Sequence, residues 1–77
     1  MLDLHEAMDI VKKKEPNMNI NHVLEYENYY GFVDLMNGNS CIYTVNKETG
    51  ETKWMHMLES SKMRILKLIK PNQLEES

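Results

Sequence analysis

The chain has 77 residues and a formal net charge of −3, with twelve acidic and nine basic side chains. A chain of this length folds as one domain around a small core, which leaves little room for a deep pocket enclosing both a substrate and a catalytic constellation. Its acidic balance argues against a general nucleic-acid-binding protein, because such proteins carry a clustered excess of lysine and arginine.

The cysteine content and the hydropathy of the sequence indicate the cellular compartment of the protein. The single cysteine, Cys41, cannot form an internal disulfide, which excludes a small secreted disulfide scaffold. No apolar run approaches about 18 residues, and the first residues lack a positively charged region followed by an apolar one. We therefore expect a cytoplasmic protein that does not bind a membrane.

The first predicted element is a helix at residues 3–14. Asp3 is placed to cap it, and Glu6 completes a capping-box pattern. Pro16 ends it, because proline lacks an N–H group and restricts the residue before it. One apolar stripe follows helical spacing and consists of Leu4, Ala7, Met8 and Val11.

Residues 20–58 predict a four-stranded antiparallel meander, so the expected fold class is α+β. These residues are rich in β-branched and aromatic side chains, and the first of them alternate with the period of a half-buried strand. The turn formers Asn37 and Gly38 favour a chain reversal. The first expected strand begins at Ile20, and the other three cover residues 30–36, 41–46 and 51–58.

The segment "NKETG" predicts a hairpin turn, with a binding loop as the alternative. If Asn46 pairs with Glu51, the loop is 47–50 and needs a left-handed residue last, which Gly50 supplies. The Asn46 side chain can accept bonds from the following backbone N–H groups. This register pairs Cys41 with His56, Tyr43 with Trp54, Val45 with Thr52, Thr44 with Lys53, and Ile42 with Met55.

The two faces of this hairpin lead to different expectations. We expect the first helix to cover the face of Tyr43 and Trp54, which form a favourable cross-strand aromatic pair. The opposite face, bearing Ile42, Met55 and Met57, is too apolar to be left in water. A C-terminal helix, a second copy of the chain or a partner could cover it, and we favour an interface.

The last part of the chain predicts a short helix at 60–70, followed by a disordered tail at 71–77. Ser60 or Ser61 can cap this helix, and its apolar side would hold Met63, Ile65, Leu66 and Ile69. An alternating strand is the competing interpretation, because Ile65 and Ile69 are β-branched. The basic side chains of 62–70 are expected to form a solvated face of the packed helix.

Chemistry-bearing residues are few. Ligand pairs with zinc-binding spacing do not occur, so we expect no metal and no cofactor. His5 and Asp9 at i, i+4 suggest a surface contact. Cys41 and His56 are the minimum for thiolate chemistry, but they lack an orienting Asn or Asp, and a buried structural cysteine is expected. We predict that the chain is not an enzyme.

The chain has a predicted helix that ends before Pro16, then several strands, and then a hairpin reading "YTVNKETGETKWM". In this arrangement it resembles PepSY-like domains and small immunity proteins of bacterial toxin–immunity systems. The resemblance covers about residues 3–58. It implies a helix on an antiparallel sheet, and it implies binding and inhibition of another protein without catalytic residues. The matching hairpin positions are Val45, Asn46, Lys47, Glu48, Thr49, Gly50 and Glu51.

We therefore predict a non-catalytic protein-binding module of a bacterium or phage, most specifically an immunity protein that neutralises a toxin. The alternative is a phage-encoded inhibitor whose acidic side chains mask a nucleic-acid-binding surface of a host protein. The expected partner is a protein or a second copy of the chain, with neither nucleic acid nor membrane. The candidate contact residues are Ile42, Met55 and Met57 on the apolar face, and Glu25, Glu27 and Asp34 among the acids.

Overall fold

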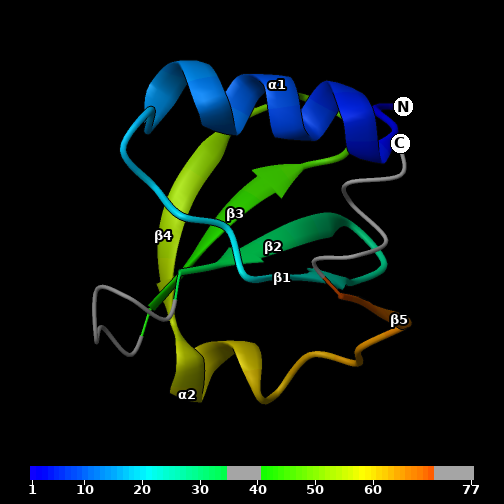
Figure 1. Ribbon diagram of the computed structural model, residues 1–77. Coiled ribbons are helices and arrows are strands. Elements are labelled where there is room, and N and C mark those ends of the chain that lie inside the picture. The colour runs from blue at the N-terminus through cyan, green and yellow to red at the C-terminus, as the bar shows by residue number, and fades with distance from the viewer. Residues whose placement is uncertain (35–40, 71–77) are drawn as a thin grey trace.

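The computed structural model describes residues 1–34 and 41–70, except for the side chain of Met57. These residues form an α+β fold in which a helix lies across one face of an antiparallel sheet (Figure 1). The turn predicted at Asn37 and Gly38 and the tail predicted at 71–77 lie outside the described residues. The elements in chain order are α1 (Leu4–Lys14), β1 (His22–Glu25), β2 (Tyr29–Val33), β3 (Cys41–Asn46), β4 (Thr52–His56), α2 (Met57–Ser60) and β5 (Lys67–Ile69).

The sheet has five strands in the order β4-β3-β2-β1-β5, and all neighbours are antiparallel. The first four form the predicted meander, whereas the predicted helix at 60–70 is wrong. A helix of one turn, α2, begins at Met57, and β5 then pairs with β1. Ile69 pairs with Val23 and is buried. The competing strand interpretation, which rested on β-branched residues such as Ile69, therefore holds at this position.

Helix α1 agrees with the prediction, with Asp3 as its N-cap. The Glu6 N–H donates to Asp3 Oδ1 at 2.9 Å, and the Asp3 N–H donates to Glu6 Oε1 at 3.2 Å. This reciprocal capping box satisfies N–H groups that have no partner inside the helix. Ala7 and Val11, from the predicted apolar stripe, are completely buried against the sheet.

The β3–β4 hairpin has the predicted register, and its loop has the predicted geometry. Asn46 Oδ1 accepts from the N–H groups of Glu48 at 2.8 Å and Thr49 at 3.1 Å. Gly50 has a φ of 76°, in the left-handed region that a residue with a Cβ rarely occupies. The Gly50 N–H donates to the Asn46 carbonyl at 2.9 Å. Every expected bond of the turn is therefore present.

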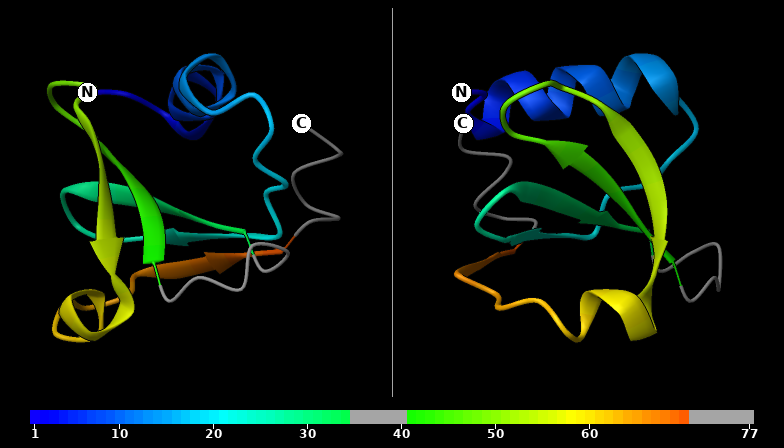
Figure 2. Two further views of the ribbon diagram at one scale, coloured as in Figure 1. Left: turned by 90° about the vertical axis from the view of Figure 1, so that its left-hand side faces the viewer. Right: turned by 180° about the vertical axis from the view of Figure 1, so that it is seen from behind.

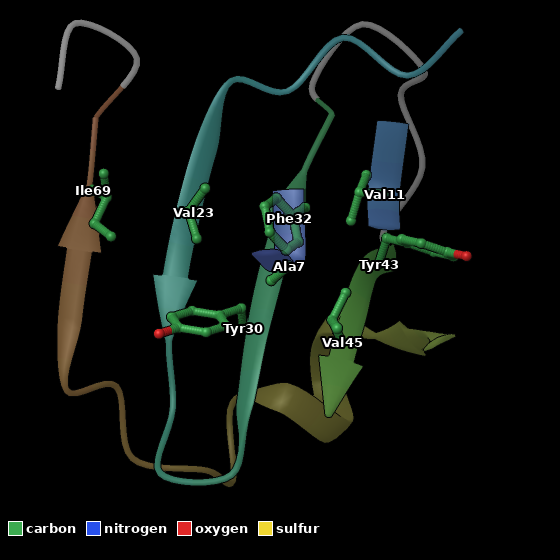
Figure 3. Packing of buried hydrophobic residues seen from close by; sticks show 8 residues of the cluster. All are labelled: Ala7, Val11, Val23, Tyr30, Phe32, Tyr43, Val45 and Ile69. Atoms are coloured by element: carbon green, nitrogen blue, oxygen red, sulfur yellow. The ribbon is translucent and has the colours of Figure 1, made fainter. Parts of the chain in front are cut away.

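The first core cluster lies between α1 and the sheet and draws side chains from α1, β1, β2, β3 and β5 (Figure 3). Tyr43 belongs to it, and its ring contacts that of Trp54 with 4.8 Å between the centroids. The prediction that α1 covers this face is confirmed for Tyr43 and Val45, whereas Trp54 is 44% exposed. The buried members are Ala7, Val11, Val23, Tyr30, Phe32, Tyr43, Val45 and Ile69.

A second core cluster lies on the other face, where Figures 1 and 2 show α2 on the side of the sheet away from α1. Ile42 and Met55 are buried there with Tyr26 and Val33, and half-buried Met63 packs against them. The expectation that this face is an open interface is wrong, because Tyr26 and the residues after α2 cover it. Packing is tight: a Cβ on Gly31 would lie 3.0 Å from Ile42 Cδ1.

We expect Ile42→Ala to lower the free energy of unfolding by about 3 kcal/mol, because it leaves a cavity in the second cluster. Urea unfolding followed by circular dichroism measures this change. Leu58→Ala is the control, since that side chain is exposed, and its effect should stay below about 0.5 kcal/mol. Equal effects of the two substitutions would contradict a covered second face.

Candidate functional site

The predicted contact residues do not share one exposed surface. Ile42 and Met55 are core residues of the second cluster. Met57 begins α2 instead of continuing a strand, and its side chain is outside the described part. Asp34 is buried, and its Oδ2 accepts from the Asn19 N–H at 3.0 Å, which fixes the segment between α1 and β1.

The other two predicted acids differ from each other. Glu25 is half-buried, and its Oε2 lies 2.8 Å from Lys47 Nζ. Glu27 is exposed in the turn between β1 and β2. Of the three acids, Glu27 alone combines exposure with a position in a turn, so they do not form the acidic patch that would mask a basic surface.

Lys47 is the centre of a polar cluster at the hairpin end of the sheet. Its side chain is only 6% exposed, and Nζ lies 4.8 Å from the centroid of the Tyr30 ring in addition to its ion pair with Glu25. The ring face and the carboxylate both stabilise the buried ammonium. Its backbone also bonds in both directions: the Leu2 N–H donates to the Lys47 carbonyl at 2.7 Å, and the Lys47 N–H donates to the Asn28 carbonyl at 2.9 Å.

Tyr30 also belongs to this cluster, and the pKa of its phenol is raised. Burial raises its pKa above the ordinary value of 10.0, and the negative charges of Glu25 and Asp3 raise it further. The neutral phenol is therefore the stable form in the folded chain across the physiological pH range. These contacts give the cluster a structural role, because they hold the N-terminus and two turns together.

Cys41 and His56 are cross-strand neighbours, as the register predicts. Cys41 is half-buried instead of fully buried, and His56 is exposed. His56 Nδ1 accepts from the Leu58 N–H at 3.1 Å, so this nitrogen is engaged with the backbone at the start of α2. The contact with Leu58 gives His56 a local role in the turn from β4 into α2.

Residues 1–34 and 41–70 offer neither a metal-binding cluster nor a helix that could span a membrane. No group of three His, Cys, Asp or Glu side chains in these ranges could hold a metal ion. His5 and Asp9 are exposed on α1. The helices in the same ranges are too short and too polar to cross a membrane.

A group of exposed apolar side chains lies after β4, and sequence analysis did not predict it. Four large apolar side chains are between 48 and 72% exposed here, and we call them the C-terminal surface: Leu58, Ile65, Leu66 and Leu68. Ile65 and Leu66 were expected on the buried side of a helix, which is wrong. The basic side chains Lys62, Arg64, Lys67 and Lys70 are exposed in the same segment.

A groove of about 450 Å³ adjoins this surface. It lies between the β1–β2 turn and the residues after α2, so it is bordered by segments far apart in the sequence. Aromatic rings, two apolar side chains and both charge signs line this groove. Its lining residues are Tyr26, Glu27, Asn28, Tyr29, Met63, Arg64 and Leu66.

Comparison of the chain with protein-family models, curated proteins and solved structures gave no match. The resemblance to PepSY-like domains and immunity proteins stays a prediction. The C-terminal surface is the candidate site, because its apolar side chains are exposed.

We expect Lys47→Ala to lower the free energy of unfolding by about 2–3 kcal/mol, measured by urea unfolding. The substitution leaves Glu25 without its cation and removes the charge over the Tyr30 ring, and partial exposure of Glu25 keeps the loss below that of a fully buried pair. Lys53→Ala, at an exposed position of β4, should change stability by less than about 0.5 kcal/mol. Similar losses would show that the cluster adds no stability.

The raised pKa of Tyr30 predicts a loss of stability at alkaline pH. Its contribution is fully present below pH 10.0, the ordinary pKa, and is lost as pH rises towards the higher folded-state pKa, because the unfolded chain ionises more readily. Urea unfolding from about pH 9 to about pH 11 should therefore show a smaller decline for Tyr30→Phe than for the native chain. Identical slopes would contradict a perturbed phenol.

Proposed function

We propose that this chain is a non-catalytic protein-binding module that uses the C-terminal surface to bind its partner, and that neutralisation of a toxin is its specific role. The observation that supports this proposal is the exposure of Leu58, Ile65, Leu66 and Leu68 together on one short segment. Exposed apolar side chains scattered singly are ordinary, whereas a group of them rimmed by polar residues is typical of an interaction site.

The energetics of a small domain strengthen this interpretation. Burying one leucine or isoleucine side chain completely contributes about 1.5–3 kcal/mol. Four such side chains are about half exposed or more, so the fold loses several kcal/mol of possible burial free energy. The net stability of a domain of this size has a similar magnitude. A bound protein would remove these side chains from water and recover that free energy.

The groove beside Leu66 supports a protein partner over a small substrate. Its lining combines the rings of Tyr26 and Tyr29 with the charges of Glu27 and Arg64. Tyrosine and arginine are enriched at the centres of protein interfaces, where one side chain of the partner enters such a hollow. The alternative of an acidic inhibitor has weaker support, because Asp34 is buried and Glu25 pairs with Lys47.

We expect Leu66→Asp to abolish capture of the partner from an extract of the cells that produce the chain, measured by affinity capture and mass spectrometry. A carboxylate buried at a protein interface is costly to desolvate, and the substitution also removes an apolar side chain from the surface. Asn17→Asp is the matched control, because it adds the same charge at an exposed position after α1.

The captured protein should inhibit growth when expressed alone, and co-expression of this chain should restore growth. Capture that is equal for the native chain, Leu66→Asp and Asn17→Asp would overturn the proposed binding surface. A captured protein without toxicity would overturn the immunity role and leave the binding role in place.

A further inference from the structure

Strand β5 is the outermost strand on its side of the described sheet. It pairs with β1 through Val23, Leu24 and Glu25, and Figure 1 shows it at the border of the sheet opposite β4. An edge strand presents backbone N–H and C=O groups on its outer side, and an extended segment of another protein can pair with them.

The register identifies which backbone groups of β5 face outward. The Tyr26 N–H donates to the Tyr29 carbonyl at 2.8 Å, in the same register that pairs Leu24 with Gly31. Because backbone groups alternate between the two neighbours of a strand, Leu24 bonds to β2 while Val23 and Glu25 face β5. The Glu25 carbonyl faces the β5 side: it accepts at 2.7 Å from the N–H of Leu66, the residue before Lys67, which lies opposite Glu25.

The alternation then continues into β5. Val23 lies opposite Ile69 and Glu25 lies opposite Lys67, so the alternation directs the backbone groups of these two β5 residues back to β1. Leu68, between them, directs its N–H and C=O to the outer side of the strand. Its side chain lies on the face of the sheet away from α1 and is about half exposed. A docking segment would find both a backbone partner and an apolar side chain at Leu68.

The charge of residues 57–70 indicates which kind of segment would dock on β5. Residues 57–70 contain four basic side chains and one acidic side chain, whereas the rest of the chain contains five basic and eleven acidic ones. The basic side chains of 57–70 are all exposed; Lys67 begins β5, and Arg64 lies three residues before it. Positive potential around an edge strand attracts acidic segments and repels basic ones.

A second copy of the chain fits this edge poorly. Two-fold antiparallel pairing about Leu68 would place the Lys67 side chains of both copies on one face as diagonal neighbours, and like charges so placed repel. Lysine on an edge strand is a common device against self-association. Insertion into a lipid layer is also disfavoured, because the outward backbone groups of Leu68 would lose hydrogen-bond partners.

We propose that the partner adds an extended, acidic segment to the outer edge of β5 as a further antiparallel or parallel strand, with its apolar side chains packed on Leu66 and Leu68. This proposal rests on the proposed protein-binding function and names the chemistry of the partner. It assigns affinity to the Leu68 backbone and selectivity to Arg64 and Lys67.

The first test substitutes Leu68 and measures binding of a synthetic peptide of about ten residues in which glutamate alternates with leucine and valine. Leu68→Pro removes the outward N–H while leaving the bonds of Lys67 and Ile69 to β1, since proline is tolerated on an edge strand when its nitrogen faces outward. Leu68→Ala keeps the N–H and is the matched control. Isothermal titration should show binding at least about tenfold weaker for Leu68→Pro than for Leu68→Ala.

The second test changes charge. Arg64→Glu combined with Lys67→Glu should weaken peptide binding at least about tenfold, whereas Lys12→Glu combined with Lys13→Glu, on α1, should change it less than about twofold. A peptide with lysine in place of glutamate should not bind. Raising the salt concentration should weaken binding of the glutamate peptide. Circular dichroism of every variant checks that the fold is retained.

The outcomes separate this proposal from the proposed function. If Leu68→Pro captures the cellular partner as well as Leu68→Ala does while Leu66→Asp does not, strand addition is wrong and protein binding stands. If none of these substitutions changes capture, the proposed function fails as well. If the native chain binds phosphatidylglycerol vesicles but not the glutamate peptide, the surface serves a membrane and strand addition is overturned.

Discussion

An antiparallel sheet with two apolar faces imposes the main constraint on this chain, because one long helix covers only one of them. Helix α1 covers the face of Val23, Phe32 and Val45, and the second cluster must find its cover elsewhere. Tyr26 and Met63 supply it, so the chain after β4 has to turn to the far side of the sheet (Figure 2). The position of β5 beside β1 and the exposure of the C-terminal surface both follow from that path.

Lys47 organises the end of the sheet where the β1–β2 turn meets the β3–β4 loop, and its role there is structural. Lys47 bonds through its backbone to Leu2 near the N-terminus and to Asn28 in the β1–β2 turn. Its side chain contacts Glu25 and Tyr30. A loop whose first residue is so fully engaged is poorly suited to move or to adapt to a ligand. The proposed binding surface is instead the segment after β4, where the apolar side chains are exposed.

Local chemistry made the hairpin and α1 predictable, whereas the C-terminal segment depended on contacts distant in sequence. The capping pair Asp3 and Glu6, and the turn residue Gly50, act within a few positions of one another. The residues "RILKLIK" fit helical and strand periods, and pairing with β1 decides between them. Sequence analysis missed the candidate site because the exposure of Leu66 and Leu68 depends on the pairing of β5 with β1. Only the charges of the site can be read from the sequence.

Amide hydrogen exchange of the chain, free and bound to its captured partner, tests the assignment of function to β5 most directly. Strand addition protects backbone amides that are open in the free protein. The account predicts new protection within residues 66–69, centred on Leu68, with little change in α1 or in the loop at 47–50. Protection concentrated in α1 or in that loop, with β5 unchanged, would contradict it.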